Sequence, residues 1–263
     1  MYTSKVPIVS LRELEELPDP IAAFGRDYPS GHLVERHTHL RAQLIYASSG
    51  IMRVDTPSGV WIVPPMRGVW VPPMVLHEIR AISAVSLRTL LLRRGVKEGL
   101  PEECCVIDVS SLLRELILRM IELAETQPPV SPSEPLIEMI LSEIREIAAL
   151  PLHIPMPVDL RARRICQGIL LNPSDGKTSK QWGASVGASS RTLERLFQKE
   201  TGISFASWRR QARLLAAMAR LAEGSPVANV ALDLGYQSPS AFTAMFKRVL
   251  GHPPSEFFQD QRF

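Results

Sequence analysis

The sequence has no hydrophobic run that approaches about 18 residues, the length that a membrane-spanning helix requires. We therefore expect no transmembrane helix and no membrane partner. Residues 1–10 contain one lysine and no long apolar stretch, which argues against a secretory signal peptide. Only three cysteines are present, and Cys104, Cys105 and Cys166 are too few and too unevenly spaced for a disulfide framework or a cysteine-rich zinc site. These absences favour a cytoplasmic protein with free thiols.

The charge of the 263-residue chain is distributed unevenly, and its length predicts roughly two domains of about 150 residues. Residues 159–263 carry 15 basic and 8 acidic side chains, a net charge of +7, whereas residues 1–158 carry 15 and 19, a net charge of −4. This asymmetry indicates that only the C-terminal part meets a polyanion such as nucleic acid. A solvated basic surface would give the same count, so charge alone does not decide between the two.

Short β-type runs, separated by turn residues, fill residues 21–107. Thr56–Gly59 has the composition of a hairpin turn, and the pairs Pro64-Pro65 and Pro72-Pro73 mark loops or sheet edges because proline cannot donate a ladder hydrogen bond. Several short strands with this punctuation predict a β-sandwich or barrel in an N-terminal domain of residues 1–110. The expected strands are residues 43–49, 51–55, 60–63, 69–71, 76–82 and 87–93.

Two amphipathic segments predict a helical hairpin over residues 111–150. Ser111 is placed to cap a helix at residues 112–126, and a second helix is expected at residues 134–150. Their apolar stripe either packs on the barrel or pairs with its twin in a homodimer, and the sequence leaves both interpretations open. Residues 151–157 contain three prolines and predict an extended linker between domains.

Residues 158–263 predict an all-helical domain with an internal repeat. In each copy a glycine, Gly187 or Gly235, follows a short helix, and a serine, Ser189 or Ser238, stands at the start of the next. Glycine adopts a left-handed turn conformation without strain, and serine caps a helix N-terminus. Helix, glycine turn and capped helix form the helix-turn-helix motif, whose second helix enters a DNA major groove.

More specific residue patterns extend through both copies of the repeat. They are Arg191–Ile203, Arg213, Ala216, Val230-Ala231, Leu234–Lys247 and Gly251–Pro254. In order, spacing and residue type these segments, within about residues 160–258, resemble the AraC/XylS family of bacterial transcription regulators. The resemblance implies two helix-turn-helix units on one linking helix, placed to read successive major-groove segments of double-stranded operator DNA. The chain is therefore expected to be an α+β protein, with a barrel, a helical hairpin and an all-α DNA-binding domain.

The resemblance also implies which side chains meet DNA. They are Ser190, Arg191, Thr192 and Arg195 in the first recognition helix, and Gln237, Ser238, Pro239, Ser240, Thr243, Lys247 and Arg248 in the second. Arg195 is best placed for bidentate readout of guanine, although a phosphate contact would use the same side chain. Two positions depart from the family pattern. Ala244 replaces a longer polar residue, so the second helix is expected mainly to grip phosphates. Gly183 replaces alanine, at an expected cost of about 1 kcal/mol inside a helix and for no evident reason.

A histidine pattern marks the N-terminal half. The spacing of Gly31, His37, His39, Gln43 and Gly50 resembles the first cupin motif. Gln43 stands where metal-binding cupins usually have glutamate. A later histidine, His77, resembles the histidine of the second cupin motif. Histidines two residues apart on a strand point to the same side, and Gln43 lies at an even offset from them. His37, His39, Gln43 and His77 therefore predict a site for a divalent metal such as Zn, Ni, Fe or Mn, or else a polar pocket that hydrogen-bonds an effector.

Three aromatic residues, Tyr46, Trp61 and Trp70, are candidates for lining an effector cavity, although aromatic residues of a small barrel commonly form its core. Taken together, the patterns favour a DNA-binding transcription regulator, not an enzyme, in which a cupin-like sensor binds a small-molecule effector. Homodimerisation through the hairpin is expected, and an activator would also contact RNA polymerase. Two alternatives are a cupin metalloenzyme, such as a dioxygenase or isomerase, and a constitutive DNA-binding protein with a structural barrel.

Overall fold

The computed structural model describes residues 18–126, 130–145, 152–250 and 252–257. The chain divides into two compact units, Met1–Pro57 with Ile62–Ala149, and Ser58–Trp61 with Leu150–Phe263. The start of the chain, Pro151 and the predicted helical residues 146–150 lie outside the described ranges. Among the helices that are described, none is long and apolar enough to cross a membrane.

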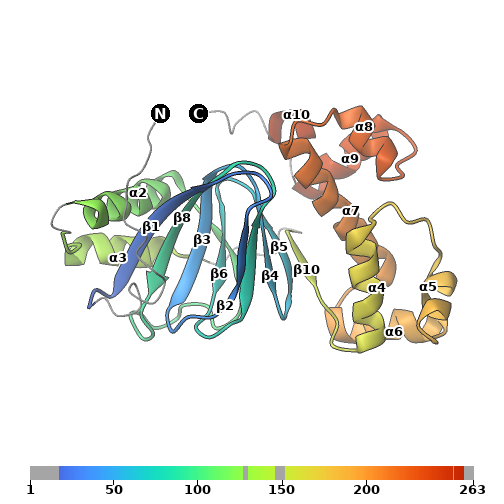
Figure 1. Cartoon of the computed structure of the whole chain (residues 1–263), viewed down its shortest axis with the longest axis horizontal. Helices are drawn as coiled ribbons and strands as arrows, with labels where there is room; N and C mark the ends of the chain where they lie inside the picture. The colour runs from blue at the N-terminus through green and yellow to red at the C-terminus, as the bar shows by residue number, and fades with distance from the viewer. Residues whose placement is uncertain (1–17, 127–129, 146–151, 251, 258–263) are drawn as a thin grey trace. The chain divides into compact units, whose positions relative to one another are not determined.

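Two five-stranded antiparallel sheets form the N-terminal part of the fold (Figure 1). The first has the order β1 (Ile21–Tyr28), β8 (Val85–Leu92), β3 (Ala42–Ser49), β6 (Arg67–Val71) and β9 (Cys105–Asp108). The second has the order β10 (His153–Pro155), β5 (Gly59–Val63), β4 (Met52–Thr56), β7 (His77–Ala81) and β2 (Leu33–His37). With the helices that follow, these sheets confirm the predicted α+β architecture.

Strand alternation divides β3 between two environments. Leu44 and Tyr46 belong to a hydrophobic cluster that continues into the following helices, and Trp70, the partner of Leu44 on β6, joins them. Gln43 lies on the opposite face, where its amide contacts Thr89 of β8. The first sheet therefore has an apolar face under the helices and a face that carries buried polar side chains.

Helix α2 (Ser111–Glu125) and helix α3 (Glu134–Glu143) pack along this apolar face (Figure 1). The N-cap of α2 is Ser110, whose hydroxyl accepts from Leu113 N, and not Ser111 as the pattern predicted. The predicted stripe is confirmed as the buried side of α2; its buried members are Leu113, Leu116, Ile117, Met120 and Ile121.

Helix α3 ends seven residues before the predicted end at residue 150, since α3 stops at Glu143. Ile144 has an extended ψ of 101°, and this conformation places its side chain in the same hydrophobic cluster as α2. Burial of Ile144 therefore accompanies the end of the helix. The apolar stripe of the hairpin packs on the sheet, which is one of the two interpretations that the sequence left open.

The predicted extended linker contains a strand. β10 pairs with β5, and the ring of His153 stacks on Trp61 with 3.8 Å between centroids. A Cβ at Gly59 would lie 2.2 Å from His153 Nε2, so this pairing requires glycine at position 59. Burial lowers the pKa of His153 to about 4, and its imidazole is therefore neutral at pH 7.

The second unit is helical beyond β10. Its helices are α4 (Leu160–Leu171), α5 (Ser179–Ser185), α6 (Ser190–Thr201), α7 (Phe205–Ala222), α8 (Val227–Asp233), α9 (Pro239–Leu250) and α10 (Pro254–Phe257). The long helix α7 contacts α4 and α6 from the first repeat and α8 from the second. The core of the second unit is aromatic around Phe197, Phe205 and Trp208. The ring of Phe197 meets the rings of Phe205 and Trp208 edge to face.

The structure explains Gly183, the departure from the family pattern that had no evident reason. The carbonyl oxygen of Gly183 accepts hydrogen bonds from Val186 N and Ala188 N, which draws the turn after α5 back over the helix. A Cβ at position 183 would lie only 2.5 Å from Ala188 O. This close backbone approach requires glycine despite its low helix propensity.

We expect Gly183→Ala to lower the free energy of unfolding by about 1–3 kcal/mol, because overpacking against backbone outweighs the gain in helix propensity. Urea unfolding of the full chain measures the change. Gly176→Ala is the matched control, since a Cβ there meets nothing within 4 Å, and it should change stability by less than about 0.5 kcal/mol. A more stable Gly183→Ala protein would contradict this account.

Candidate functional site

Both helix-turn-helix repeats have the predicted turn and cap. Gly187 and Gly235 take the left-handed φ values of 67° and 77°. Ser189 Oγ accepts from Thr192 N at 3.1 Å, and Ser238 Oγ accepts from Ala241 N at 3.1 Å. Each second helix, α6 or α9, therefore begins at a satisfied N-terminus directly after a glycine turn.

The predicted DNA-contacting side chains lie outside the core. Six of them are exposed, namely Arg191, Arg195, Gln237, Ser240, Lys247 and Arg248, and Ser190, Thr192, Ser238, Pro239 and Thr243 are partly buried. Of the positions between them, Leu193, Phe197, Ala231, Leu234 and Phe246 are buried. The amphipathic pattern of α6 and α9 thus presents polar and basic groups on the outer side of each helix.

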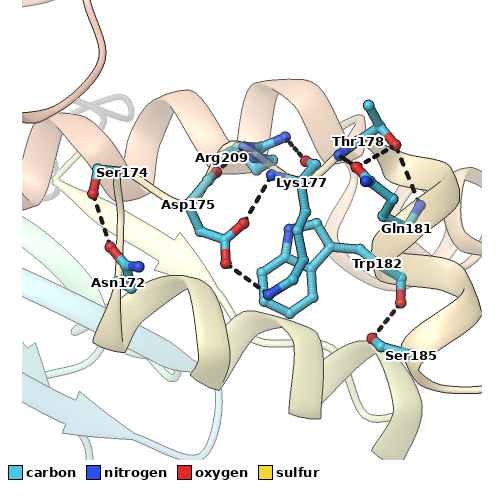
Figure 2. A network of polar contacts seen from close by, with 9 residues as sticks. All are labelled: Asn172, Ser174, Asp175, Lys177, Thr178, Gln181, Trp182, Ser185 and Arg209. Atoms are coloured by element: carbon cyan, nitrogen blue, oxygen red, sulfur yellow. Dashed lines mark hydrogen bonds and ion pairs between the residues drawn. The ribbon is translucent and has the colours of Figure 1, made fainter.

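Arginines of α7 hold the loop between α4 and α5, and Figure 2 shows one of them, Arg209. Arg209 donates from its two terminal nitrogens to Asp175 O at 2.6 Å and Lys177 O at 2.8 Å. Arg213 Nε donates to Pro173 O at 3.2 Å. These bonds satisfy three loop carbonyls from the linking helix, which fixes the entry to the first helix-turn-helix unit. The sequence pattern marked Arg213 but not Arg209.

The same loop is closed by a second set of contacts, which Figure 2 also shows. Lys177 Nζ lies 2.8 Å from Asp175 Oδ2 and 4.5 Å from the centre of the Trp182 ring. The hydrogen bond from the Lys177 side chain lowers the pKa of Asp175. Thr178 and Gln181 form a reciprocal capping box at the start of α5.

A separate cluster lies in the barrel. His37 at the end of β2, His39 in the following loop and His77 at the start of β7 each offer a ring nitrogen, and these three atoms lie within 4.8 Å of one another. Gln43 of β3 joins them: its Oε1 lies 2.9 Å from His39 Nε2 and 3.0 Å from His77 Nε2. The four residues that the sequence predicted as one site are therefore brought together.

The hydrogen bonds around the cluster fix where its protons are. The Nδ1 atoms of His37, His39 and His77 face the carbonyl oxygens of Glu35, Arg41 and Val75. A carbonyl only accepts, so each Nδ1 donates. A neutral imidazole has a single N–H, and each Nε2 therefore keeps a lone pair that is directed into the cluster.

Thr89 fixes the amide of Gln43 in the same way. The Thr89 hydroxyl donates to Leu44 O at 2.8 Å, so its oxygen is left to accept from Gln43 Nε2 at 3.0 Å. This bond turns Gln43 Oε1 toward the histidines. Four electron-pair donors, three nitrogens and one oxygen, then face one another without a proton between them. Such a set fits a divalent cation.

Burial disfavours the charged form of two of the imidazoles, those of His37 and His77. Burial lowers the pKa of His77 to about 3 and also lowers the pKa of His37, and the neighbouring histidines add to both effects. Protonation of both nitrogens on His77 is therefore unfavourable near pH 7. The lone pair of His77 Nε2 is available to coordinate a cation.

The structure does not bring the three aromatic candidates to this cluster. Tyr46 and Trp70 lie on the helix-covered face of the first sheet, where the Trp70 indole donates to Pro101 O. Trp61 stacks on His153. Thr89, by contrast, belongs to the site but was not predicted. Its signal was a threonine beside Arg88 within the otherwise apolar run Leu87–Leu92.

Comparisons with known proteins agree with both parts of this description. Residues 22–144 match the AraC-like ligand binding domain family, and residues 182–260 match a helix-turn-helix domain family. The chain is 33% identical over 221 residues to the HTH-type transcriptional regulator NimR of Escherichia coli K12, covering 84% of this chain and 81% of NimR.

One further relative and one solved structure cover different shares of the chain. The HTH-type transcriptional regulator RipA of Corynebacterium glutamicum is 36% identical over 107 residues, 41% of this chain and 32% of RipA. A crystal structure of unsaturated fatty acid bound ToxT from Vibrio cholerae aligns with a TM-score of 0.39 and 11% identity, covering 90% of this chain and 95% of that one.

The loop anchor leads to a test of stability. Arg209→Lys should lower the free energy of unfolding by about 1–2 kcal/mol, because a lysine cannot donate to both carbonyls from one planar group. Arg210→Lys is the control: Arg210 is exposed and bonds to Ser207 within α7, so its change should stay below about 0.5 kcal/mol. Equal effects in chemical denaturation would show that the two carbonyl bonds do not hold the loop.

Proposed function

The chain belongs to the AraC family of helix-turn-helix transcription regulators, and we propose that α6 and α9 bind an operator in double-stranded DNA while the N-terminal barrel senses a small-molecule effector. The observation that carries the DNA-binding part is the pair of capped second helices with exposed polar and basic faces. We propose regulation and not catalysis. The histidine cluster does not argue against this, because it would serve a sensor as well as it would serve an enzyme.

We assign base reading to the first recognition helix. Arg195 is exposed on α6, and its guanidinium matches the acceptor pair of a guanine. On α9 the exposed residues Lys247 and Arg248 lie in the last turn, and Ala244 offers no polar group to a base. The second helix therefore contributes mainly phosphate contacts and positions the first.

We propose that His37, His39, His77 and Gln43 hold a divalent ion in the barrel. The support is the set of four lone pairs, each fixed by a hydrogen bond behind it. Such an ion, when bound, offers an effector a Lewis-acidic coordination position. This chain orients the ligands through three backbone carbonyls and Thr89, and it buries His39, Gln43 and His77 away from water.

We further propose that the protein acts in the cytoplasm as a homodimer, and that it contacts RNA polymerase if it activates. Leu112 on α2 and Met139 on α3 are 46% and 44% exposed although the buried stripe of each helix faces the sheet. They provide apolar contacts for a second copy of the hairpin. The effector can change DNA binding only through its differential affinity for two arrangements of the protein.

Two variants, one of Arg195 and one of Lys247, test the DNA interface. Arg195→Ala should weaken binding to a selected operator by about 1–3 kcal/mol and relax one base position, whereas Lys247→Ala should weaken all sequences alike and reduce the salt slope by about one unit. Fluorescence anisotropy over a salt series measures both. Arg94→Ala, an exposed charge of the first unit, should leave binding unchanged. An equal loss on every sequence for Arg195→Ala would assign it to phosphate.

The metal site is tested by titration of the metal-free full chain with Zn²⁺, Ni²⁺, Mn²⁺ and Fe²⁺. We expect one equivalent of a divalent ion per chain, and a loss of affinity of at least about tenfold in His77→Ala because one ligand is removed. His252→Ala, which removes an exposed imidazole elsewhere, should bind as the wild type does. Wild-type protein that takes up no ion, or an unaffected His77→Ala, would favour the hydrogen-bonding pocket instead.

A further inference from the structure

We propose that the histidine site selects a small organic carboxylate with an apolar body as its effector, because the described part of the barrel supplies four neutral ligands for a divalent ion and no buried carboxylate to neutralise it. This inference rests on the metal site proposed above. It adds the chemical class of the effector, which the metal site alone does not specify.

The charge of the buried residues carries the argument. The buried polar and charged side chains of the described part of the chain are His39, Arg41, Gln43, His77 and Thr89. No aspartate or glutamate is among them. A loaded site would therefore consist of a divalent ion, three neutral imidazoles and a neutral amide.

The acidic residues nearest to the ligands in the sequence, Glu35 and Glu78, are not among the buried side chains. Glu35 gives only its carbonyl oxygen to His37, and the residue is exposed. Glu78, which follows His77, pairs with Arg36 at 3.4 Å and Arg80 at 3.6 Å. Because adjacent residues of a strand point to opposite faces, this carboxylate and the imidazole before it are directed apart.

An uncompensated charge in a site removed from water attracts an anion strongly, since the attraction is weakly screened there. Divalent ions that accept five or six ligands keep positions open beyond the four protein donors. An oxygen anion that enters such a position neutralises part of the charge, whereas a neutral molecule does not. Glutamine at position 43, where a glutamate would supply one negative charge, thus leaves that charge to the effector.

The loops that carry the ligands indicate the apolar body. Leu40, Met74 and Leu76 are 63%, 60% and 42% exposed. Leu40 follows His39, Leu76 precedes His77, and Met74 N donates to His39 O at 2.9 Å, so the two loops are joined beside the cluster. Met74 also has a φ of 65°, a strained conformation for a side chain of this size, which that hydrogen bond helps to hold.

The experiment compares matched acids and amides on the full chain loaded with Co²⁺. Calorimetry measures the binding of two acids, benzoate and hexanoate, and of their neutral counterparts, benzamide and hexanamide. Acetate serves as the acid without an apolar body. The visible absorption of Co²⁺ is recorded in parallel, because it responds to a change in the ligands of the ion. We expect each of the two larger acids to bind at least about tenfold more tightly than its amide and than acetate, and to change the absorption spectrum.

A single isosteric variant tests the charge directly. Gln43→Glu should bind Co²⁺ at least as tightly as the wild type and bind benzoate at least about tenfold more weakly, because its carboxylate now neutralises the ion. Gln167→Glu makes the same change of charge at an exposed position of α4 and should leave both affinities unchanged.

Several results would overturn the proposal. The proposal fails if benzamide or hexanamide binds as tightly as the matching acid, or if neither acid binds to the loaded wild type. It also fails if Gln43→Glu leaves the benzoate affinity unchanged. The wild-type comparison of acids and amides needs no variant and so decides the matter even if Gln43→Glu does not fold. A chain that takes up no Co²⁺ overturns the metal site as well. Operator binding, measured on the same protein by anisotropy, tests the regulator function separately.

Discussion

The alternation of side chains along β3 is the constraint on which both the core and the histidine site depend. One set of residues, including Leu44 and Tyr46, enters the apolar cluster under α2, and the intervening Gln43 turns to the opposite face. A shift of register by one residue would exchange the two sets, placing an amide in the hydrocarbon core and an aromatic ring among the histidines. The packing of the hairpin therefore also fixes the orientation of the site.

Local patterns of the sequence were sufficient for the helix-turn-helix units, because glycine turns and serine caps act within five residues. The sequence also named the members of the histidine cluster, but the expected reason, alternation along one strand, is wrong. His37 ends β2 of one sheet, His39 lies in the loop that follows, and Gln43 lies on β3 of the other sheet. What could not be predicted depends on partners that are distant in sequence. The pairing of β10 with β5 needs Gly59, about a hundred residues earlier, to admit His153. The end of α3 coincides with the burial of Ile144 among core residues from distant strands.

The same limit explains the aromatic candidates and Gly183. Residue type alone identified Tyr46 and Trp70 as large and apolar, but only the strand register assigns them to the helix-covered face. Helix propensity predicted that glycine at position 183 is unfavourable, whereas the carbonyl of Ala188 in the following turn excludes any side chain there. In both cases the deciding contact is made by backbone that a propensity scale does not include.

Glutamine at position 43 has consequences in two directions. A neutral amide binds a divalent ion less strongly than a carboxylate would, so the proposed site would give up some metal affinity. In return a bound ion would keep a charge that an anionic effector could neutralise, through a strong interaction that a neutral competitor lacks. Thr89 is essential to this balance, because its hydroxyl is committed to Leu44 O and can only accept from the amide. The polarity of one strand residue thereby fixes which end of Gln43 faces the histidines. In the proposal, this orientation decides which class of molecule the barrel senses.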